Sequence, residues 1–355
     1  MTTVHAIRGY VTKRIRARGR GAAIIGAAGT SLLSRGLSII TSLSTVPIVL
    51  HHLGPQRYGV WMAAIALSAF FTMADGGVTK GLIAEVAKAH GAHDRAAIRR
   101  LISSALTATV TFVVLLGVAA VLAVGAVDWT WAFNLSDPAL GREARNTILT
   151  IVLCYGFSWI ATVIREARVG MLQAAAVNLW DATGLALGFA GIAAAAHFGW
   201  GLVAIAGIWT GGPALMRAVS ALWFLRTEGR DLVPTWRDVD AATCRRLVSA
   251  GSIFVIYALT TVLATQCDQV LIARFLGPEA VTQYTIVQRL FQQPQVLVML
   301  GLVAQWPAYG EALGRGDTAW IRRHFRWSLP GYAAFAAVLA GLLVVFGLIT
   351  AVNVS

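Results

Sequence analysis

Charged side chains are scarce in this sequence. Only 13% of its 355 residues are Asp, Glu, Lys or Arg, whereas 57% are apolar. A soluble domain carries about 25% charged residues, because its surface faces water. The sequence therefore has too little charge to coat a water-soluble globule, and this excludes a soluble enzyme.

Residues for disulfide, metal or nucleotide chemistry are also few. The three cysteines (Cys154, Cys244 and Cys267) are scattered, and two of them lie inside apolar runs. They have neither the pairing of a disulfide framework nor the spacing of metal ligands, so we interpret them as small buried side chains. A glycine-rich loop of P-loop spacing is missing as well. We expect no metal site and no cofactor, and a membrane gradient rather than ATP as any energy source.

Long apolar runs are abundant. Four of them contain no charged residue: Leu101–Val127, Ala182–Met216, Leu247–Cys267 and Trp327–Ser355. About 20 such residues span the hydrocarbon core as a helix, where the backbone must satisfy its own hydrogen bonds. We therefore predict an all-α polytopic membrane protein with about nine transmembrane helices. The predicted spans are 31–52, 58–78, 101–127, 146–164, 175–197, 201–225, 250–274, 280–307 and 327–351.

The basic residues are distributed unevenly between alternate connections. The N-terminal segment and the connections 79–100, 165–174, 226–249 and 308–326 together hold 22 Lys and Arg, whereas the other connections hold four. The positive-inside rule makes the richer side cytoplasmic, including the N-terminus. The excess of basic residues behind the net charge of +13 is thus explained by membrane topology, and we do not expect nucleic-acid binding.

Two sequence segments recur at an offset of 223 residues. Six of ten positions agree between 91–100 and 314–323, and Leu53-Gly54-Pro55 falls on Leu276-Gly277-Pro278. This offset predicts two parallel six-helix repeats, the second of which stops after three helices. Parallel repeats are a known transporter architecture. We predict a basic segment at 1–30, a first bundle at 31–249, and the start of a second bundle at 250–355.

Several strings together resemble a known family. They are Leu-Gly-Pro-Gln-Arg-Tyr-Gly-Val-Trp at 53–61, Ala-Asp-Gly-Gly at 74–77, Glu85, the 94–100 loop, and Asp-Gln-Val-Leu-Ile-Ala-Arg-Phe-Leu-Gly-Pro-Glu-Ala at 268–280. Over most of residues 30–350 the chain resembles the polysaccharide flippases, which export O-antigen and teichoic acid. These belong to the multidrug/oligosaccharidyl-lipid/polysaccharide (MOP) superfamily.

The resemblance implies two six-helix bundles around a cationic cavity in the bacterial inner (cytoplasmic) membrane. It implies that an undecaprenyl-pyrophosphate-linked oligosaccharide is flipped through this cavity from the inner to the outer leaflet. The expected partners are that lipid-linked oligosaccharide, membrane lipids and other polysaccharide assembly proteins. Family members usually complete twelve or more helices, so a non-functional truncated fragment stays an alternative.

Basic and amide side chains inside or at the ends of the spans are the candidate substrate-binding residues. Arginine binds phosphate oxygens bidentately and keeps its charge in a low dielectric, and ionisable residues inside spans are functional hypotheses by default. The candidates are Arg35, Arg57, Arg274, Arg289 and Gln292. Arg35 lies on a serine- and threonine-rich helix face, and the alternative is that it extends to the headgroups. We interpret Arg217 as such an interfacial side chain.

Two acids near the apolar zone, Asp75 and Asp268, are candidates for ion coupling or for pairing with a cavity arginine. Asp75 precedes Gly76-Gly77, so a helix-end turn is the alternative. Seven tryptophans near predicted span ends fit an interfacial aromatic belt better than sugar stacking. They are Trp61, Trp129, Trp131, Trp200, Trp223, Trp236 and Trp327.

Two other functions stay open. A cation-coupled multidrug exporter of the same superfamily would need acids deep in the first bundle, for which Asp75 and Asp181 are weak candidates. A membrane glycosyltransferase, ligase or polymerase would need a catalytic acid or a large outer loop. The longest outer loop, 128–145, contains Asp128, Asp137 and Glu143 but is too short for a catalytic domain. We therefore expect no catalytic residue.

Overall fold

The computed structural model describes residues 2–69, 78–289, 292 and 318–352. Every regular element among them is a helix, which confirms the all-α prediction. The chain divides into two compact units, residues 1–282 and 283–355. Helix α10 (Thr318–Val352) belongs to the second unit and covers the ninth predicted span. The division of the sequence into bundles at residue 249 stays a prediction.

Helix α1 (Thr2–Ala69) contains the break that the sequence predicts between its first two spans. Gly54 has φ 77° and ψ 169°, a left-handed φ that only glycine adopts at little cost. Pro55 follows it and begins the next helical segment, because proline lacks the N–H that a continuous helix would need. The second predicted span, 58–78, is helical to Ala69 and then leaves the described residues.

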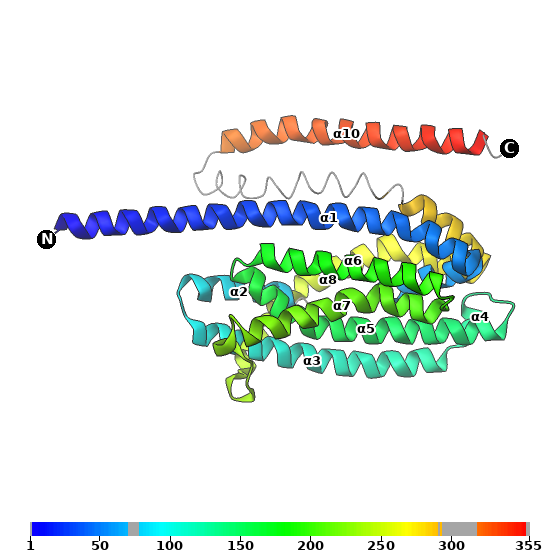
Figure 1. Ribbon diagram of the computed structural model, residues 1–355, viewed down its shortest axis with the longest axis horizontal. Helices are drawn as coiled ribbons and strands as arrows, with labels where there is room; N and C mark the ends of the chain where they lie inside the picture. The colour runs from blue at the N-terminus through cyan, green and yellow to red at the C-terminus, as the bar shows by residue number, and fades with distance from the viewer. Residues whose placement is uncertain (1, 70–77, 290–291, 293–317, 353–355) are drawn as a thin grey trace. The chain divides into compact units, whose positions relative to one another are not determined.

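The first unit continues as a set of helices that pack lengthwise (Figure 1). They are α2 (Val78–Gly91), α3 (Arg95–Ala126), α4 (Trp129–Ala132), α5 (Pro138–Gly170), α6 (Ala174–His197), α7 (Leu202–Arg226) and α8 (Ala241–Leu276). Helix α7 packs against both α5 and α6, α3 packs against α5, and α1 packs against α6 and α8.

Five segments in the described part of the chain are long and apolar enough to cross a membrane. They are Gly29–Ala69 of α1 and the whole of α3, α5, α6 and α7. Helix α8 covers the seventh predicted span, and most of the eighth lies outside the described residues. This finding confirms a multi-pass membrane protein.

Two helices begin about two turns before the predicted membrane spans that they contain. Helix α5 begins at Pro138 rather than near residue 146, and α8 begins at Ala241 rather than near 250. In both cases an aspartate immediately before the helix accepts hydrogen bonds from backbone N–H groups: Asp137 from Ala139 and Asp240 from Thr243. Such caps stabilise helix starts beyond the apolar run that marks the membrane-spanning part.

Small residues allow α6 and α7 to approach closely. A Cβ atom on Gly184 would lie 3.0 Å from Cα of Pro213, and one on Gly212 would lie 3.1 Å from Cα of Gly188. Membrane helices depend on such close backbone packing, because lipid gives little hydrophobic driving force for association. The contact fixes the two helices that carry much of the site described below.

The core of the first unit has two apolar clusters. One contains Trp61, Ile148 and Leu202 and their neighbours, and the other contains Leu82, Ile102 and Phe224 and theirs. Along α7 the first cluster ends near Trp209 and the second begins at Ala221. The intervening stretch of α7 carries Arg217 and faces polar residues of α5 and α6.

The prediction that Trp61 and Trp129 belong to an interfacial belt is wrong. Trp61 is fully buried and packs edge-to-face against Tyr58 and Trp209, with ring centroids 5.9 and 6.1 Å away. Trp129 is buried as well and donates its indole N–H to the carbonyl of Val124 at 2.8 Å. Both indoles fill helix junctions of the core. Trp131, Trp200, Trp223 and Trp236 are exposed, as a belt requires.

The two Leu-Gly-Pro copies contact each other. Gly277 repeats the backbone of Gly54, with φ 86° and ψ 171°, and residues 278–289 then form a helix. Thr282 donates its hydroxyl to the carbonyl of Pro55 at 2.5 Å. Gly59 packs on the carbonyl of Pro278 so closely that a Cβ atom there would overlap it.

This contact is reciprocal in sequence. Gly59 and Thr282 are separated by the offset of 223 that relates the two copies, and so are Pro55 and Pro278. Gly59 of the first copy thus packs on the carbonyl of Pro278, and Thr282, at the equivalent position of the second copy, bonds to the carbonyl of Pro55. Such an exchange is what a pseudo-two-fold axis between the copies produces.

The connection between α7 and α8, residues 227–240, is held on α3; we call it the strap. It contains two short 3₁₀ turns, η2 (Arg230–Leu232) and η3 (Trp236–Asp238). Arg95 of α3 donates to both carboxylate oxygens of Asp231 at 2.6 Å, and Arg99 pairs with Asp238 at 2.9 Å. The hydrogen bond from Arg95 lowers the pKa of Asp231 below its ordinary value, and the hydroxyl of Thr235 does the same for the pKa of Asp238.

We expect Gly59→Ala to destabilise the first unit, because the added methyl group overlaps the carbonyl of Pro278. Overpacking of this kind costs about 1–3 kcal/mol. The measurement is the thermal unfolding midpoint of the detergent-purified protein. Gly36→Ala in the same helix is the matched control, since a Cβ atom there meets nothing within 4 Å. Equal midpoints for the two variants would show that the Gly59 contact does not hold the copies together.

Candidate functional site

A network of charged side chains joins α5, α6 and α7, three of the helices that are long and apolar enough to cross a membrane. Asp181 of α6 lies between two arginines. One of its oxygens accepts from Arg165 of α5 at 2.7 and 2.9 Å, and the other accepts from Arg217 of α7 at 3.2 Å. Arg217 also donates to the hydroxyl of Ser158 at 2.8 Å. Arg165 further pairs with the adjacent Glu166 at 2.8 Å.

The network lies well within the helices that carry it. Arg165 is five residues from the end of α5, Asp181 seven from the start of α6, and Arg217 nine from the end of α7. At 1.5 Å per residue these positions are about 8–14 Å from that end of the bundle. Because α5, α6 and α7 alternate in direction, the three ends coincide, and the charges gather at one depth.

Charges at this depth are costly unless they are paired. The side chain of Glu166 is 5% exposed, Asp181 is 16%, Arg165 is 26% and Arg217 is 34%. Each carboxylate therefore has at least one arginine partner, and the two cations and two anions compensate one another. The pairing explains why these helices tolerate four ionised groups in a low dielectric.

Arg168 adds a third cation to this layer. It is 1% exposed, donates to the hydroxyl of Ser220 at 2.7 Å and to the amide oxygen of Gln173 at 3.0 Å, and lies 5.1 Å from the ring of Phe224. Gln173 in turn donates to Glu228 of the strap at 2.8 Å. Arg168 thus interacts with the carboxylate of Glu228, both across space and through Gln173, so that the three arginines face the three carboxylates of Glu166, Asp181 and Glu228.

A cavity of about 200 Å³ lies beside Arg217. Its walls combine aromatic, hydroxyl and small side chains from α5, α6 and α7: Tyr155, Ser158, Leu185, Gly188, Trp209, Thr210, Pro213 and Arg217. Arg217 is shared between this cavity and the ionic network. It uses Nε and Nη1 for Asp181 and Ser158, and guanidinium has five N–H donors in all. The contacts within the described part of the chain leave the remaining donors available to an anionic or hydroxylated ligand.

The chemistry of this cavity suits a polar, partly anionic molecule. An arginine fork binds phosphate oxygens, hydroxyls pair with sugar hydroxyls, and an indole presents a flat apolar face. Trp209 is itself fixed by its edge-to-face contact with the buried Trp61. A ligand here would meet preformed partners rather than mobile side chains.

Two of the predicted arginines, Arg57 and Arg274, make side-chain contacts within the first unit. Arg57 of α1 donates to one oxygen of Glu143 at 3.0 Å, while the other oxygen accepts from the backbone N–H of Leu202 at 3.3 Å. The guanidinium of Arg274 lies 4.0 Å from the ring of Trp131, a cation–π contact. Both arginines connect helix ends. Substrate binding by them stays a prediction.

The other predicted residues are spread along the chain. Arg35 is half-buried on α1, and Asp268 is exposed on α8. Asp75 lies outside the described residues. Arg289 and Gln292 belong to the second unit, and their role with the first-unit arginines stays a prediction.

The interpretation of Arg217 as an interfacial side chain is wrong. It points to Asp181 and Ser158 inside the bundle, because a carboxylate at the same depth on α6 pairs with it more favourably than the distant headgroups would. Arg165 was missed as a site residue, and Asp181 was named only as a weak candidate acid of a multidrug exporter. Arg165 lies one residue beyond the predicted span 146–164 and was therefore counted with the cytoplasmic connection, so the predicted spans did not place it beside Asp181 and Arg217.

The acids of the outer loop have structural partners. Asp128 accepts from the backbone N–H of Thr130 at 2.9 Å and caps α4, Asp137 caps α5, and Glu143 binds Arg57. These contacts account for the three carboxylates that a catalytic reading of residues 128–145 would have used.

The fold of this chain is shared with solved transporters. An inward-facing multidrug resistance transporter of the MATE family in the MOP superfamily matches with a TM-score of 0.61 at 14% identity, covering 86% of this chain and 68% of that one. An outward-facing multidrug resistance transporter of the same family matches with a TM-score of 0.57 at 14% identity, covering 90% and 77%. A MOP superfamily transporter from Pyrococcus furiosus matches at 0.54 with 15% identity, covering 90% and 76%. The chain therefore has the fold of the MOP superfamily transporters.

The family follows from the sequence itself. The model of the family described as polysaccharide biosynthesis protein matches residues 26–312, so the chain belongs to that family. It is also 23% identical over 303 residues to a Salmonella typhi protein named as an O-antigen transporter, covering 84% of this chain and 67% of that protein. These findings confirm the resemblance drawn from the motifs.

We expect Asp181→Asn to destabilise the protein, because Arg165 and Arg217 lose their shared carboxylate. Breaking a fully buried pair costs about 3–5 kcal/mol, and partial exposure of the arginines reduces this to roughly 1–3 kcal/mol. Thermal unfolding in detergent measures the change. Asp231→Asn is the control, since its exposed pair with Arg95 is worth at most about 1 kcal/mol. An Asp181→Asn midpoint equal to that of the control would contradict the structural importance of the network.

Proposed function

We propose that this protein flips an undecaprenyl-pyrophosphate-linked oligosaccharide from the inner to the outer leaflet for polysaccharide biosynthesis. The observation that supports it most is the cluster of arginines on α5 and α7 with its adjoining cavity, in a member of the polysaccharide biosynthesis family. A lipid pyrophosphate carries at least two negative charges through low dielectric. Buried, hydrogen-bonded arginines are the side chains suited to receive them.

In this proposal Arg217 is the contact for phosphate. It is the arginine that lies both in the ionic network and on the cavity wall. Tyr155 and Trp209 offer aromatic faces and the phenol hydroxyl to the sugars, whereas the Thr210 hydroxyl donates to the carbonyl of Ala206 and offers only an acceptor. When a phosphate approaches, Asp181 retains Arg165 as its partner, so Arg217 can exchange one carboxylate oxygen for a phosphate oxygen without leaving the acid unpaired.

We keep the remaining predicted residues as parts of the proposal. Arg35, Arg289 and Gln292 are further substrate contacts, whereas Arg57 and Arg274 serve mainly to hold helix ends, as their bonds to Glu143 and Trp131 suggest. Asp75 and Asp268 stay candidates for coupling or structural acids. The proposed location is the bacterial inner membrane, with the N-terminus cytoplasmic.

A cation-coupled multidrug exporter is the second candidate. The observation that favours it is Asp181, an acid inside a span of a chain with a MOP transporter fold. Such an exporter would need an acid that binds protons or cationic drugs directly. Asp181 already pairs with two arginines, which disfavours a second cation there, and we therefore prefer the flippase.

We expect the gene to restore surface polysaccharide to a bacterium that lacks its own flippase, without changing its susceptibility to cationic drugs. Arg217→Gln should lower the restored polysaccharide by roughly tenfold to a hundredfold, as expected for charge-assisted hydrogen bonds worth about 1.5–3 kcal/mol. Surface polysaccharide is measured by lectin or antibody binding at matched protein levels.

The control for this experiment is Arg142→Gln, which changes an exposed arginine at the other end of α5 and should keep full activity. Rescue by Arg217→Gln equal to that of Arg142→Gln would remove Arg217 from the transport path. A gain in drug resistance without polysaccharide would instead favour the exporter.

A further inference from the structure

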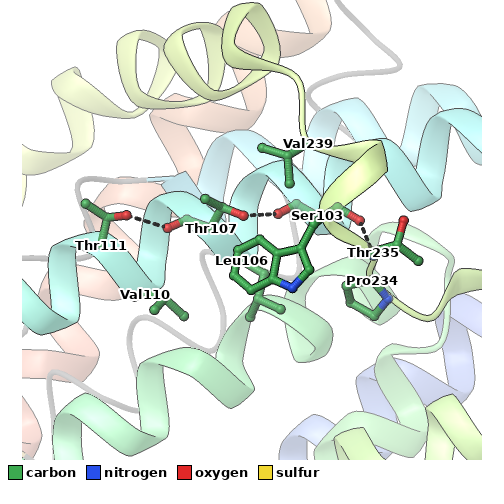
Figure 2. Close-up of a pocket in the computed structure, with 9 residues that line it drawn as sticks. Ser103, Leu106, Thr107, Val110, Thr111, Pro234, Thr235 and Val239 are labelled. Atoms are coloured by element: carbon green, nitrogen blue, oxygen red, sulfur yellow. Dashed lines mark hydrogen bonds between the residues drawn. The ribbon is translucent and has the colours of Figure 1, made fainter.

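A groove of about 400 Å³ runs between α3 and the strap (Figure 2). It is separate from the cavity of α5–α7 and shares no lining residue with it. Its walls are the third to fifth turns of α3 and the second half of the strap: Ser103, Leu106, Thr107, Val110, Thr111, Pro234, Thr235, Trp236 and Val239. Sites for small molecules have volumes of about 300–1,000 Å³, so the groove is large enough for a ligand.

The groove is preformed, because several bonds fasten the strap to α3. The backbone N–H of Thr235 donates to the hydroxyl of Ser103 at 3.2 Å, as Figure 2 shows, and that of Asp240 donates to Ser104 at 3.0 Å. The ion pairs Arg95–Asp231 and Arg99–Asp238 lie at the same end of α3. A ligand therefore does not have to order the walls when it binds.

The inner surface of the groove suits hydrocarbon. Leu106, Val110 and Val239 are aliphatic, and the proline and indole of the strap add further apolar surface. The hydroxyls of Thr107 and Thr111 already donate to the carbonyls one turn earlier, at 3.0 and 2.9 Å. They present their methyl groups and leave only acceptor capacity, so these two threonines offer no hydrogen-bond donors to a sugar.

The groove continues along the lipid-facing surface of α3. Thr107 and Thr111 are followed at helical spacing by exposed apolar side chains, and residues three or four apart share a helix face. These side chains are Val114, Leu115, Val118 and Leu122, which are 56–68% exposed. In a membrane-spanning helix such a stripe faces lipid tails. An acyl chain in the groove would thus continue into the bilayer.

Positive charge marks the other end of the stripe. Arg100 is exposed two turns before Thr107, and Arg237 is exposed on the strap next to Trp236. Arg99 is neutralised by Asp238, whereas the described residues give neither Arg100 nor Arg237 an ion pair. Trp236 is 85% exposed, as suits an interfacial indole. The positive-inside prediction places this end at the cytoplasmic leaflet, whose lipids are partly anionic.

We propose that this groove binds one anionic glycerophospholipid of the surrounding leaflet. One acyl chain lies between Leu106, Val110 and Val239, and the phosphate lies against Arg100 and Arg237. The bound lipid fills the space between α3 and the strap and so stabilises the connection that leads to α8. This proposal is independent of the transported substrate.

Native mass spectrometry of the delipidated protein, titrated with phosphatidylglycerol or with phosphatidylcholine of the same chains, tests the site. We expect one phosphatidylglycerol to bind about tenfold more tightly than phosphatidylcholine, since each surface arginine favours anionic lipid. Arg100→Gln combined with Arg237→Gln should remove this preference. Val110→Trp should abolish the bound lipid by filling the groove, and Arg142→Gln at the far end of α5 should change nothing.

A second measurement does not require the Val110→Trp substitution that fills the groove. Phosphatidylglycerol with brominated chains should quench the fluorescence of the wild-type protein more than that of Trp236→Phe. The proposal is overturned if both phospholipids bind equally, if Val110→Trp keeps the bound lipid, or if Trp236→Phe is quenched as strongly as the wild type. It is also overturned if polyprenyl phosphate displaces phosphatidylglycerol at equal concentration, because the groove would then belong to the transported lipid.

Discussion

The pairing of Asp181 with Arg165 and Arg217 is the interaction on which the first unit depends most. Charged groups inside the bilayer require partners at the same depth, and Asp181 is the partner of both arginines at once. The pairing fixes the relative heights of α5, α6 and α7, while the close contact of Gly184 and Gly188 with α7 fixes the separation of α6 and α7. The cavity beside Arg217 is a consequence, since its walls come from the same three helices.

The two ends of the first unit are held by different chemistry. At one end, Gly59 and Thr282 pack on the opposing proline carbonyls of the repeated Leu-Gly-Pro motif. At the other, the strap is held to α3 by Arg95 and Arg99 through exposed ion pairs, which are individually weak. We infer that the motif contact, built from backbone and small residues, is the firmer of the two. The strap end is then the one that ligands such as phospholipid can stabilise.

Composition and charge distribution predicted the class and most helices, because long uncharged runs in a membrane have few alternatives to a helix. The family was predicted from the resemblance of the motif strings. The break at Gly54-Pro55 was predictable for a local reason, the special backbone of glycine before proline.

The site was not predictable in the same way. The sequence around Arg217 does not distinguish an arginine at the membrane interface from one paired across helices. The burial of Trp61 likewise depends on where Tyr58 and Trp209 lie. Both are properties of tertiary packing. Arg35, Arg289 and Asp75 stay predictions.

The central claim is that this protein carries an anionic lipid-linked oligosaccharide across the bilayer. The most direct measurement is translocation in proteoliposomes, in which a polyprenyl-pyrophosphate oligosaccharide on the inner leaflet becomes accessible to a glycosidase added outside. We expect the accessible fraction to rise with time in proteoliposomes and to stay constant in protein-free liposomes. An accessible fraction that stays constant in both, with correctly folded protein in the membrane, would contradict the account.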